Sequence, residues 1–153
     1  MIASNMTNHF IKFAMMMAIG ILLNPMNMLA YRLSDLYFSR TLFYGGILMA
    51  SHMVWAHEII HYLTMGHFNM KIFGIGVFLS LLTTFFLRKQ IFVDDEQWLR
   101  RMISHHSTAL TTTHNIYKQT HNEKLKKLAN DIITTQEKEI ALMKSLLKSR
   151  HQK

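Results

Sequence analysis

The sequence contains no cysteine, which excludes disulfide bonds and thiolate metal ligands. Any binding of soft metal ions must therefore use methionine and histidine, of which the 153 residues include 13 and 10. Each abundance has a plain structural explanation, because methionine fills irregular apolar cores and histidine is common on surfaces. The arrangement of these residues, and not their number, must decide whether they bind metal.

Acidic residues are also scarce, with nine against 17 lysines and arginines, and the formal charge is +8. A basic balance can indicate nucleic-acid binding, but the chain has no DNA-binding motif and no basic strand rich in aromatics. In the C-terminal part, lysines alternate with acids, which is typical of a solvated helix face or one near anionic lipid. We expect no nucleic-acid partner. The alternating residues are Lys124, Lys126, Lys127 and Lys138 with Glu123, Asp131, Glu137 and Glu139.

Long apolar runs occupy the first part of the chain and predict a membrane anchor over residues 1–92. Three segments, 13–31, 41–65 and 72–87, have lengths close to those that cross a bilayer core of about 30 Å. Pro25 should kink the first segment. A cleaved signal peptide is the rival interpretation of that segment, but no Ala-x-Ala-like site follows it. We expect a multi-pass integral membrane protein whose partner is the lipid bilayer.

The side of the membrane that holds the tail is weakly specified. Four basic residues (Arg32, Arg40, Arg88 and Lys89) flank the face that carries the tail, against Lys12 and Lys71 on the other. The positive-inside rule then favours a cytoplasmic tail without deciding it.

Residues 94–153 predict a helical hairpin. Acids at 94–96 suit a helix N-terminus, and a first helix is expected over about 96–118. Thr120 and Glu123 have the spacing of a capping box, so a second helix should start there after a turn at 120–122. An apolar stripe at helical spacing follows: Leu125, Leu128, Ile132, Ile133, Ile140, Met143, Leu146 and Leu147. The predicted fold is all-α, with three transmembrane helices followed by a two-helix antiparallel hairpin.

Two groups of potential metal ligands stand at equal distances from this turn. His105 and His106 lie about fifteen residues before it, with Met102 one helical turn earlier, and Gln136 to Glu139 lie about as far beyond it, with Met143 on the same helical face. With a rise of 1.5 Å per residue, both groups sit about 23 Å from the tip. Imidazole and thioether suit copper(I) or silver(I), and imidazole with carboxylate also suits copper(II) or zinc. The alternative is that these side chains are ordinary core residues.

Residues 88–147 resemble the family known as domain of unknown function 305, whose members are ferritin-like helical domains. The matching residues are Asp95, Leu99, Met102, Ile103, His105, His106, Ala109, Ile132, Ile133, Gln136, Glu139, Ile140 and Met143. The three preceding spans are similar to the membrane-bound branch of that family. The resemblance implies copper or silver binding by Met102, His105, His106 and Met143, with Gln136 and Glu139 nearby. Ser104, Thr108 and Thr112 stand where the family usually has proline, glycine and methionine.

A second polar cluster lies in the segment 41–65. Met49, Met53, His57, His61 and Met65 recur every fourth residue and form one stripe. His57, Glu58 and His61 match the His-Glu-x-x-His zinc motif, with His67 at the place of a third ligand. Three interpretations stay open: a zinc hydrolase with Glu58 as base, a metal relay through Met49, Met53 and Met65, or a polar seam between helices.

The sequence therefore supports a leading hypothesis of a non-enzymatic, membrane-anchored copper- or silver-binding protein for metal handling or tolerance. Copper is the expected cofactor, and zinc is possible. The alternative is a structural membrane subunit of a larger assembly whose metal site is degenerate, and the third hypothesis is the zinc membrane hydrolase. Two helices make a thin core, so we expect a homo-oligomer or a subunit of a complex.

Overall fold

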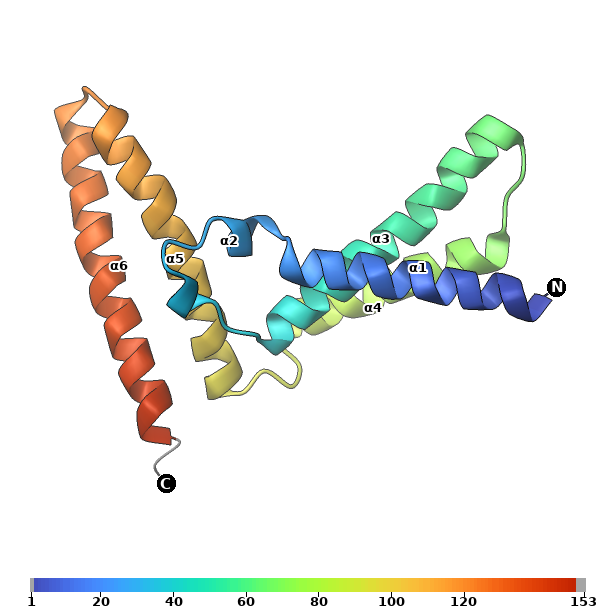
Figure 1. Cartoon of the computed structure of the whole chain (residues 1–153), viewed down its shortest axis with the longest axis horizontal. Helices are drawn as coiled ribbons and strands as arrows, with labels where there is room; N and C mark the ends of the chain where they lie inside the picture. The colour runs from blue at the N-terminus through green and yellow to red at the C-terminus, as the bar shows by residue number, and fades with distance from the viewer. Residues whose placement is uncertain (1, 151–153) are drawn as a thin grey trace. The chain divides into compact units, whose positions relative to one another are not determined.

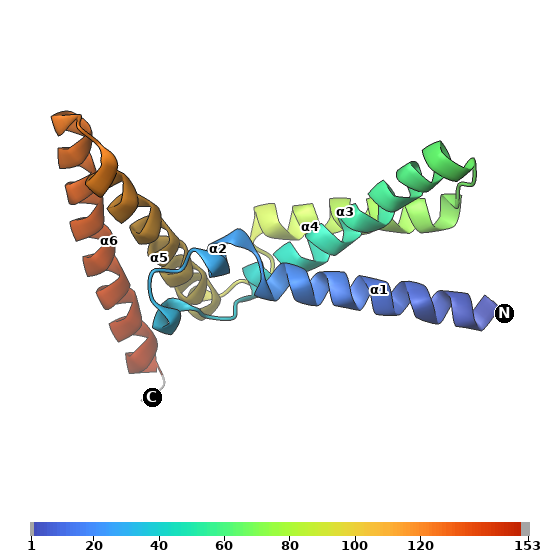
Figure 2. The same cartoon turned by 45° about the horizontal axis from the view of Figure 1, so that its top comes forward.

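A computed structural model describes residues 2–150, with side chains described from residue 8. Its helices are α1 (Ile2–Leu22), α2 (Pro25–Met28), the short 3-10 helix η1 (Leu33–Asp35), α3 (Arg40–Met65), α4 (Met70–Lys89), α5 (Asp95–Gln119) and α6 (Glu123–Arg150) (Figures 1 and 2). No strand occurs among the described residues. The predicted all-α class is therefore confirmed.

The chain forms two units, each with its own internal packing. The first contains residues 1–23 and 40–92, and the second contains residues 24–39 and 93–153. Residues 24–39, which the sequence places inside the anchor range 1–92, thus belong to the same unit as the tail. Of the tail range 94–153, residues 151–153 lie outside the described residues.

Helix α3 is the centre of the first unit, because both α1 and α4 pack on it. The helices approach closely at glycines. A Cβ on Gly46 of α3 would lie 2.5 Å from Ile21 Cγ1 of α1, and a Cβ on Gly76 of α4 would lie 3.0 Å from the Trp55 backbone nitrogen of α3. Small residues at such contacts are typical of membrane helix bundles, in which close van der Waals packing drives association.

Two segments of the first 92 residues are long and apolar enough to cross a membrane, Asn8–Met28 and Met70–Lys89. Only 6 % and 17 % of these windows are buried, so neither is the covered core helix of a globular domain. Phe78, Leu81 and Phe85 of α4 illustrate this, since all three are exposed. The helix α3 has the predicted length but not the hydropathy, because its histidines and Glu58 interrupt its apolar run. The second predicted span, 41–65, therefore lacks this support.

The first predicted span, 13–31, differs from the structure at its C-terminal end. The helix α1 stops at Leu22, and Pro25 begins the short helix α2 instead of kinking a continuous one. The Asn24 side chain caps α2 by accepting from the Met26 and Asn27 amides at 3.0 and 3.1 Å. This arrangement is favourable because proline at the first helical position lacks an N–H that would otherwise be unpaired.

The second unit contains the predicted hairpin, with α5 and α6 antiparallel and joined at residues 120–122. Its core holds Leu99, Ile103 and Leu110 of α5 against Ile140, Met143 and Leu147 of α6. On α6 these positions are three and then four residues apart, and on α5 they are four and then seven apart, which fits the spacing of a coiled-coil seam. The N-cap of α6 is Asn122 and not Thr120, because the Asn122 carboxamide accepts from the Lys124 and Leu125 amides.

Residues 24–39 form a strap that lies along α5, and its central contact is Asp35. The Asp35 side chain is fully buried. One carboxylate oxygen accepts a hydrogen bond from the Ser107 hydroxyl at 2.8 Å, and the other lies 2.5 Å from Lys144 Nζ of α6. A buried carboxylate is costly unless it is paired and hydrogen-bonded, so these two contacts hold the strap to both arms of the hairpin.

Further strap contacts are hydrogen bonds to hydroxyls on one face of α5. The Tyr31 and Arg32 amides donate to Ser107 Oγ at 2.9 and 3.3 Å. Ser104 Oγ donates to the Asp35 carbonyl and accepts from the Tyr37 amide. Since the strap has little regular structure, these hydroxyls supply partners that its backbone would otherwise lack. Tyr37 also packs against the hairpin core.

Replacing Asp35 by alanine should release the strap. Hydrogen bonds to charged groups contribute about 1.5–3 kcal/mol, so the free energy of opening the strap should fall by that amount. Hydrogen exchange of the Tyr31 and Arg32 amides in the full chain should accelerate about 10- to 150-fold. Lys138→Ala, on an exposed position of α6, is the control and should change exchange little. Unchanged protection in Asp35→Ala would contradict the assigned role.

Candidate metal site

The structure brings together two of the predicted ligands, His106 of α5 and Glu139 of α6. His106 is 8 % exposed and lies in the hairpin seam. Its Nε2 is 2.8 Å from Glu139 Oε2, whereas its Nδ1 is 2.8 Å from the Met102 carbonyl oxygen one turn earlier. The Glu139 side chain is 49 % exposed, so the pair stands at the edge of the core with access to solvent.

This arrangement suits a metal ligand. A carbonyl oxygen can only accept, so Nδ1 carries a proton, and Nε2, which lies at hydrogen-bonding distance from Glu139, is the nitrogen that remains for a metal ion. Metal-bound histidines typically donate their other N–H to a backbone carbonyl or carboxylate, which fixes the ring orientation. Two ligand atoms about 2.0–2.1 Å from one ion lie about 3 Å apart, close to the observed 2.8 Å. The Nε2–Oε2 edge could therefore bind an ion in place of the shared proton.

His105 lies beside this pair but does not face Glu139. Its ring is exposed, with its centre 6.0 Å from that of His106 and nearly perpendicular to it. The pKa of His105 is lowered from its ordinary value, first by desolvation and then by the charges of Arg101 and His106. A lowered pKa keeps the imidazole neutral near pH 7, as metal binding requires.

The other three predicted ligands occupy the hairpin core or its border. Met143 is 7 % exposed within the core, and Met102 is half-buried and packs against it. Gln136 is half-buried, and its Oε1 is buried without a hydrogen-bond partner. An orphaned buried oxygen is costly and rare in native proteins. Gln136 stands about one turn before Glu139 on α6, so an ion bound on this face of the helix would give the oxygen a partner.

Among residues 8–150, no group of three or more histidine, aspartate or glutamate side chains is close enough to hold a metal ion as it stands. The pair His106–Glu139 would thus need methionine sulfur, Gln136 or a partner molecule to complete a coordination sphere. Thr112 does not supply a ligand, because its hydroxyl bonds to the carbonyls of Thr108 and Ala109 within α5.

The second predicted site lies at the end of α3 and in the loop before α4. His57 and His67 are exposed, and His61 between them is half-buried. Glu58 is 5 % exposed, and its carboxylate accepts from the Asn69 amide at 3.0 Å. Glu58 therefore fastens the loop to α3, and this contact favours a structural role over that of a catalytic base.

The methionines of the predicted relay are all partly exposed on α3, although Met49 also approaches Gly20 of α1. Met49, Met53 and Met65 are 40 %, 54 % and 73 % exposed. A relay that runs through the interior of a bundle would bury them. Within the described part of the first unit they do not line an enclosed path, and the relay stays a prediction.

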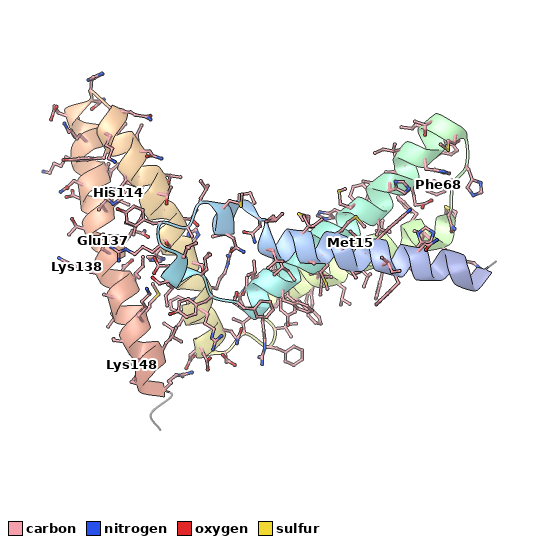
Figure 3. The ribbon with its side chains drawn as sticks, viewed as in Figure 1. Met15, Phe68, His114, Glu137, Lys138 and Lys148 are labelled. Atoms are coloured by element: carbon pink, nitrogen blue, oxygen red, sulfur yellow. The ribbon has the colours of Figure 1, made fainter. Side chains whose placement is uncertain are left out.

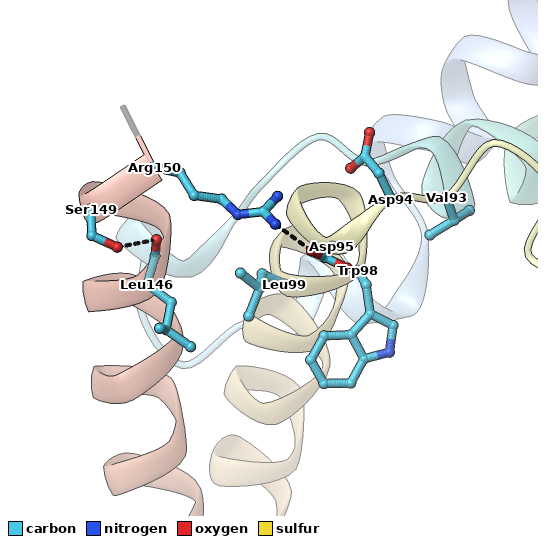
Figure 4. A pocket seen from close by; sticks show the side chains of 8 residues that line it. All are labelled: Val93, Asp94, Asp95, Trp98, Leu99, Leu146, Ser149 and Arg150. Atoms are coloured by element: carbon cyan, nitrogen blue, oxygen red, sulfur yellow. Dashed lines mark hydrogen bonds and ion pairs between the residues drawn. The ribbon is translucent and has the colours of Figure 1, made fainter. Parts of the chain in front are cut away.

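An open pocket of about 520 Å³ lies at the base of the hairpin, between the start of α5 and the end of α6 (Figure 4). Trp98, Leu99 and Leu146 line it, and an ion pair between Asp95 and Arg150 crosses it. None of the predicted metal ligands lines this pocket.

Comparison with known proteins places the tail in a family. Residues 94–153 match the domain of unknown function DUF305. The chain is also 34 % identical over 128 residues to "Uncharacterized protein L153" of Acanthamoeba polyphaga mimivirus, a match that covers 84 % of each chain. The chain belongs to the DUF305 family. Neither of these names assigns a function, and no solved structure matches the chain.

This DUF305 protein uses several residues that the sequence pattern did not single out. Asp35, Ser107 and Lys144 fasten the strap, and Tyr31 stacks on His114 with ring centres 4.8 Å apart (His114 is labelled in Figure 3). Ser104 and Thr108, which depart from the resembled pattern, both bond to the strap. A signal was present, because Ser104, Ser107, Thr108 and Thr111 form one hydroxyl stripe at helical spacing.

We expect the imidazole of His105 to titrate below its ordinary pKa when followed by NMR in the full chain. Arg101→Gln should raise that pKa, because it removes one of the positive charges that oppose protonation. Since the unfolded chain binds this proton first as the pH falls through about 6.5, His105 should lower stability at acid pH. His105→Gln should remove that part of the pH dependence. A pKa at or above 6.5 would contradict the environment described.

Proposed function

We propose that this DUF305 protein is a membrane-anchored binding protein for copper or a similar soft metal ion, with the metal as its cargo. The single observation that supports this most is the pair His106–Glu139. Its imidazole is oriented by the Met102 carbonyl through Nδ1, and its other nitrogen, Nε2, lies 2.8 Å from the Glu139 carboxylate. Met102 and Met143 are the thioethers of the same segment, and thioethers select copper(I) and silver(I).

The donor set also supports a site that can release its cargo. His106 Nε2 and Glu139 share a proton when no metal is present, so metal must displace that proton to bind. Glu139 is half-exposed, which leaves a solvent path to the ion. Binding should therefore weaken as the pH falls, because protons compete for the same nitrogen. Handling or tolerance of metal needs such reversible binding.

The anchor is proposed to cross the membrane three times, through α1 with α2, α3 and α4. Two of these segments are apolar enough to span alone, and α3 packs between their helices. Such a position suits a span of lower hydropathy, because neighbouring helices cover its small and polar residues. Gly46, Ser51 and Glu58 are buried in this way.

The alternative function is that of a structural membrane subunit whose metal site is degenerate. The observation that favours it is the separation of the ligands, since His105 is exposed and Met143 is a core residue. In this case the hairpin would act through its packing against other chains, and the described ligands would bind no ion.

Copper(I) titration of the full chain in detergent micelles distinguishes these functions. The wild type should bind at the tail site, and His106→Leu, which keeps the seam filled, should weaken that binding at least tenfold. Glu139→Gln should weaken copper(II) or zinc more than copper(I), because it removes the hard ligand but keeps the imidazole. His121→Ala, at the exposed tip of the hairpin, is the matched control and should bind like the wild type. Equal copper(I) binding by the wild type and His106→Leu would contradict the tail metal site and favour the structural function.

A further inference from the structure

The end of α3 and the loop before α4 hold three histidines whose rings are neighbours, His57 and His61 on α3 and His67 in the loop. The ring centre of His61 is 6.0 Å from that of His57 and 5.7 Å from that of His67. Two imidazoles that share one metal ion at about 2.0–2.1 Å have ring centres about 5–6 Å apart. The three rings are therefore near enough to converge on one ion if they turn, although no such group among the described residues is placed to hold an ion as it stands.

The central ring is already oriented as a ligand. His61 Nδ1 lies 3.0 Å from the His67 carbonyl oxygen, which can only accept. The proton is therefore on Nδ1, and the lone pair is on Nε2. This is the same arrangement as in His106, in which a backbone carbonyl selects the nitrogen that remains for the metal.

The loop that supplies His67 is fixed by several independent contacts. Gly66 begins it with a φ of 69°, a conformation that glycine adopts without strain. Glu58 binds the Asn69 amide, and the Asn69 side chain caps α4 through the Lys71 and Ile72 amides. Phe68, labelled in Figure 3, packs against Tyr62 and Phe73. These contacts hold His67 beside α3 at low entropic cost, which is a condition for a preorganised site.

We propose that His57, His61 and His67 form a second metal site that binds a divalent transition-metal ion, Zn²⁺ or Cu²⁺, through three imidazole nitrogens. Coordination requires the outer two rings to turn toward His61 Nε2. Both are exposed, so they can turn without displacing packed side chains. Glu58 is not a ligand, because its carboxylate is committed to Asn69; its role is to position the loop. Water would complete the coordination.

This site is distinct from the tail site in its donors and its place. It has no thioether or carboxylate ligand, so it should prefer borderline divalent ions over copper(I). It also lies at the N-terminal end of α4, whereas Arg88 and Lys89 are at the other end, about 30 Å away at 1.5 Å per residue. If α4 spans the bilayer, which rests on the proposed anchor, the loop lies at the opposite membrane surface from Arg88.

Zinc binding by the full chain in detergent micelles, measured by competition with a chromophoric chelator, tests the site. His61→Ala and His67→Ala should each remove one equivalent of bound Zn²⁺ or weaken it at least tenfold. His52→Ala, an exposed histidine of the same helix whose ring contacts Trp55, is the matched control and should keep that equivalent. Unchanged zinc stoichiometry in both loop variants, or equal loss in His52→Ala, would overturn the proposal.

Cobalt(II) absorption supplies a readout of the ligands themselves. Wild type loaded with Co²⁺ should show the intense visible bands of a four-coordinate site, and His67→Ala should lose them while its helical content by circular dichroism is unchanged. His106→Leu should retain them, since the tail site is separate. If His106→Leu removes the bands and the loop variants do not, the loop proposal fails although the tail site stands. If the bands are lost in the loop variants and the tail binds no copper, the loop site is supported and only the proposed copper binding by the tail is contradicted.

Discussion

A buried carboxylate, that of Asp35, is the constraint on which the second unit depends. It is held between the Ser107 hydroxyl of α5 and the Lys144 ammonium of α6, so one side chain joins the strap to both arms of the hairpin. Before residue 94 the sequence has only one other acid, Glu58, and it too is buried and fastens a connection by accepting from Asn69. Each buried acid thus fixes a connecting segment against helices. A buried carboxylate is costly when its partners are missing, and it favours one specific arrangement when they are present.

The strap changes how the tail should be understood. Two helices alone form a thin core, but Tyr37 of the strap covers part of it and the hydroxyls of α5 bond to the strap backbone. The seam residue His106 then lies in a hairpin that is supported on a second face. Rigid support matters for a metal ligand, because a loosely held side chain must be ordered when the metal binds, and the free-energy cost of this ordering lowers the affinity. Ser104 and Thr108 fit this role through the bonds that they make to the strap.

The helices could be predicted from the sequence, because they depend on apolar periodicity and on capping residues. The hairpin turn at 120–122 and the helices on either side of it follow from such local signals. The strap was not predicted, since it depends on a contact between Asp35 and residues more than 70 positions away. His105 and His106 are adjacent in the sequence but lie in different environments. Only His106 lies on the seam, because the seam depends on which face of α5 packs against α6. Helical spacing alone leaves that choice open.

The most direct test of the account is X-ray absorption spectroscopy of the copper-loaded full chain, compared with Met102→Leu and His106→Leu. An imidazole nitrogen shell near 2.0 Å with thioether sulfur near 2.3 Å is expected, with the sulfur lost in Met102→Leu and the imidazole scattering reduced in His106→Leu. Spectra that are identical in all three proteins, or copper bound by no imidazole, would contradict the claim that the hairpin seam is the metal site.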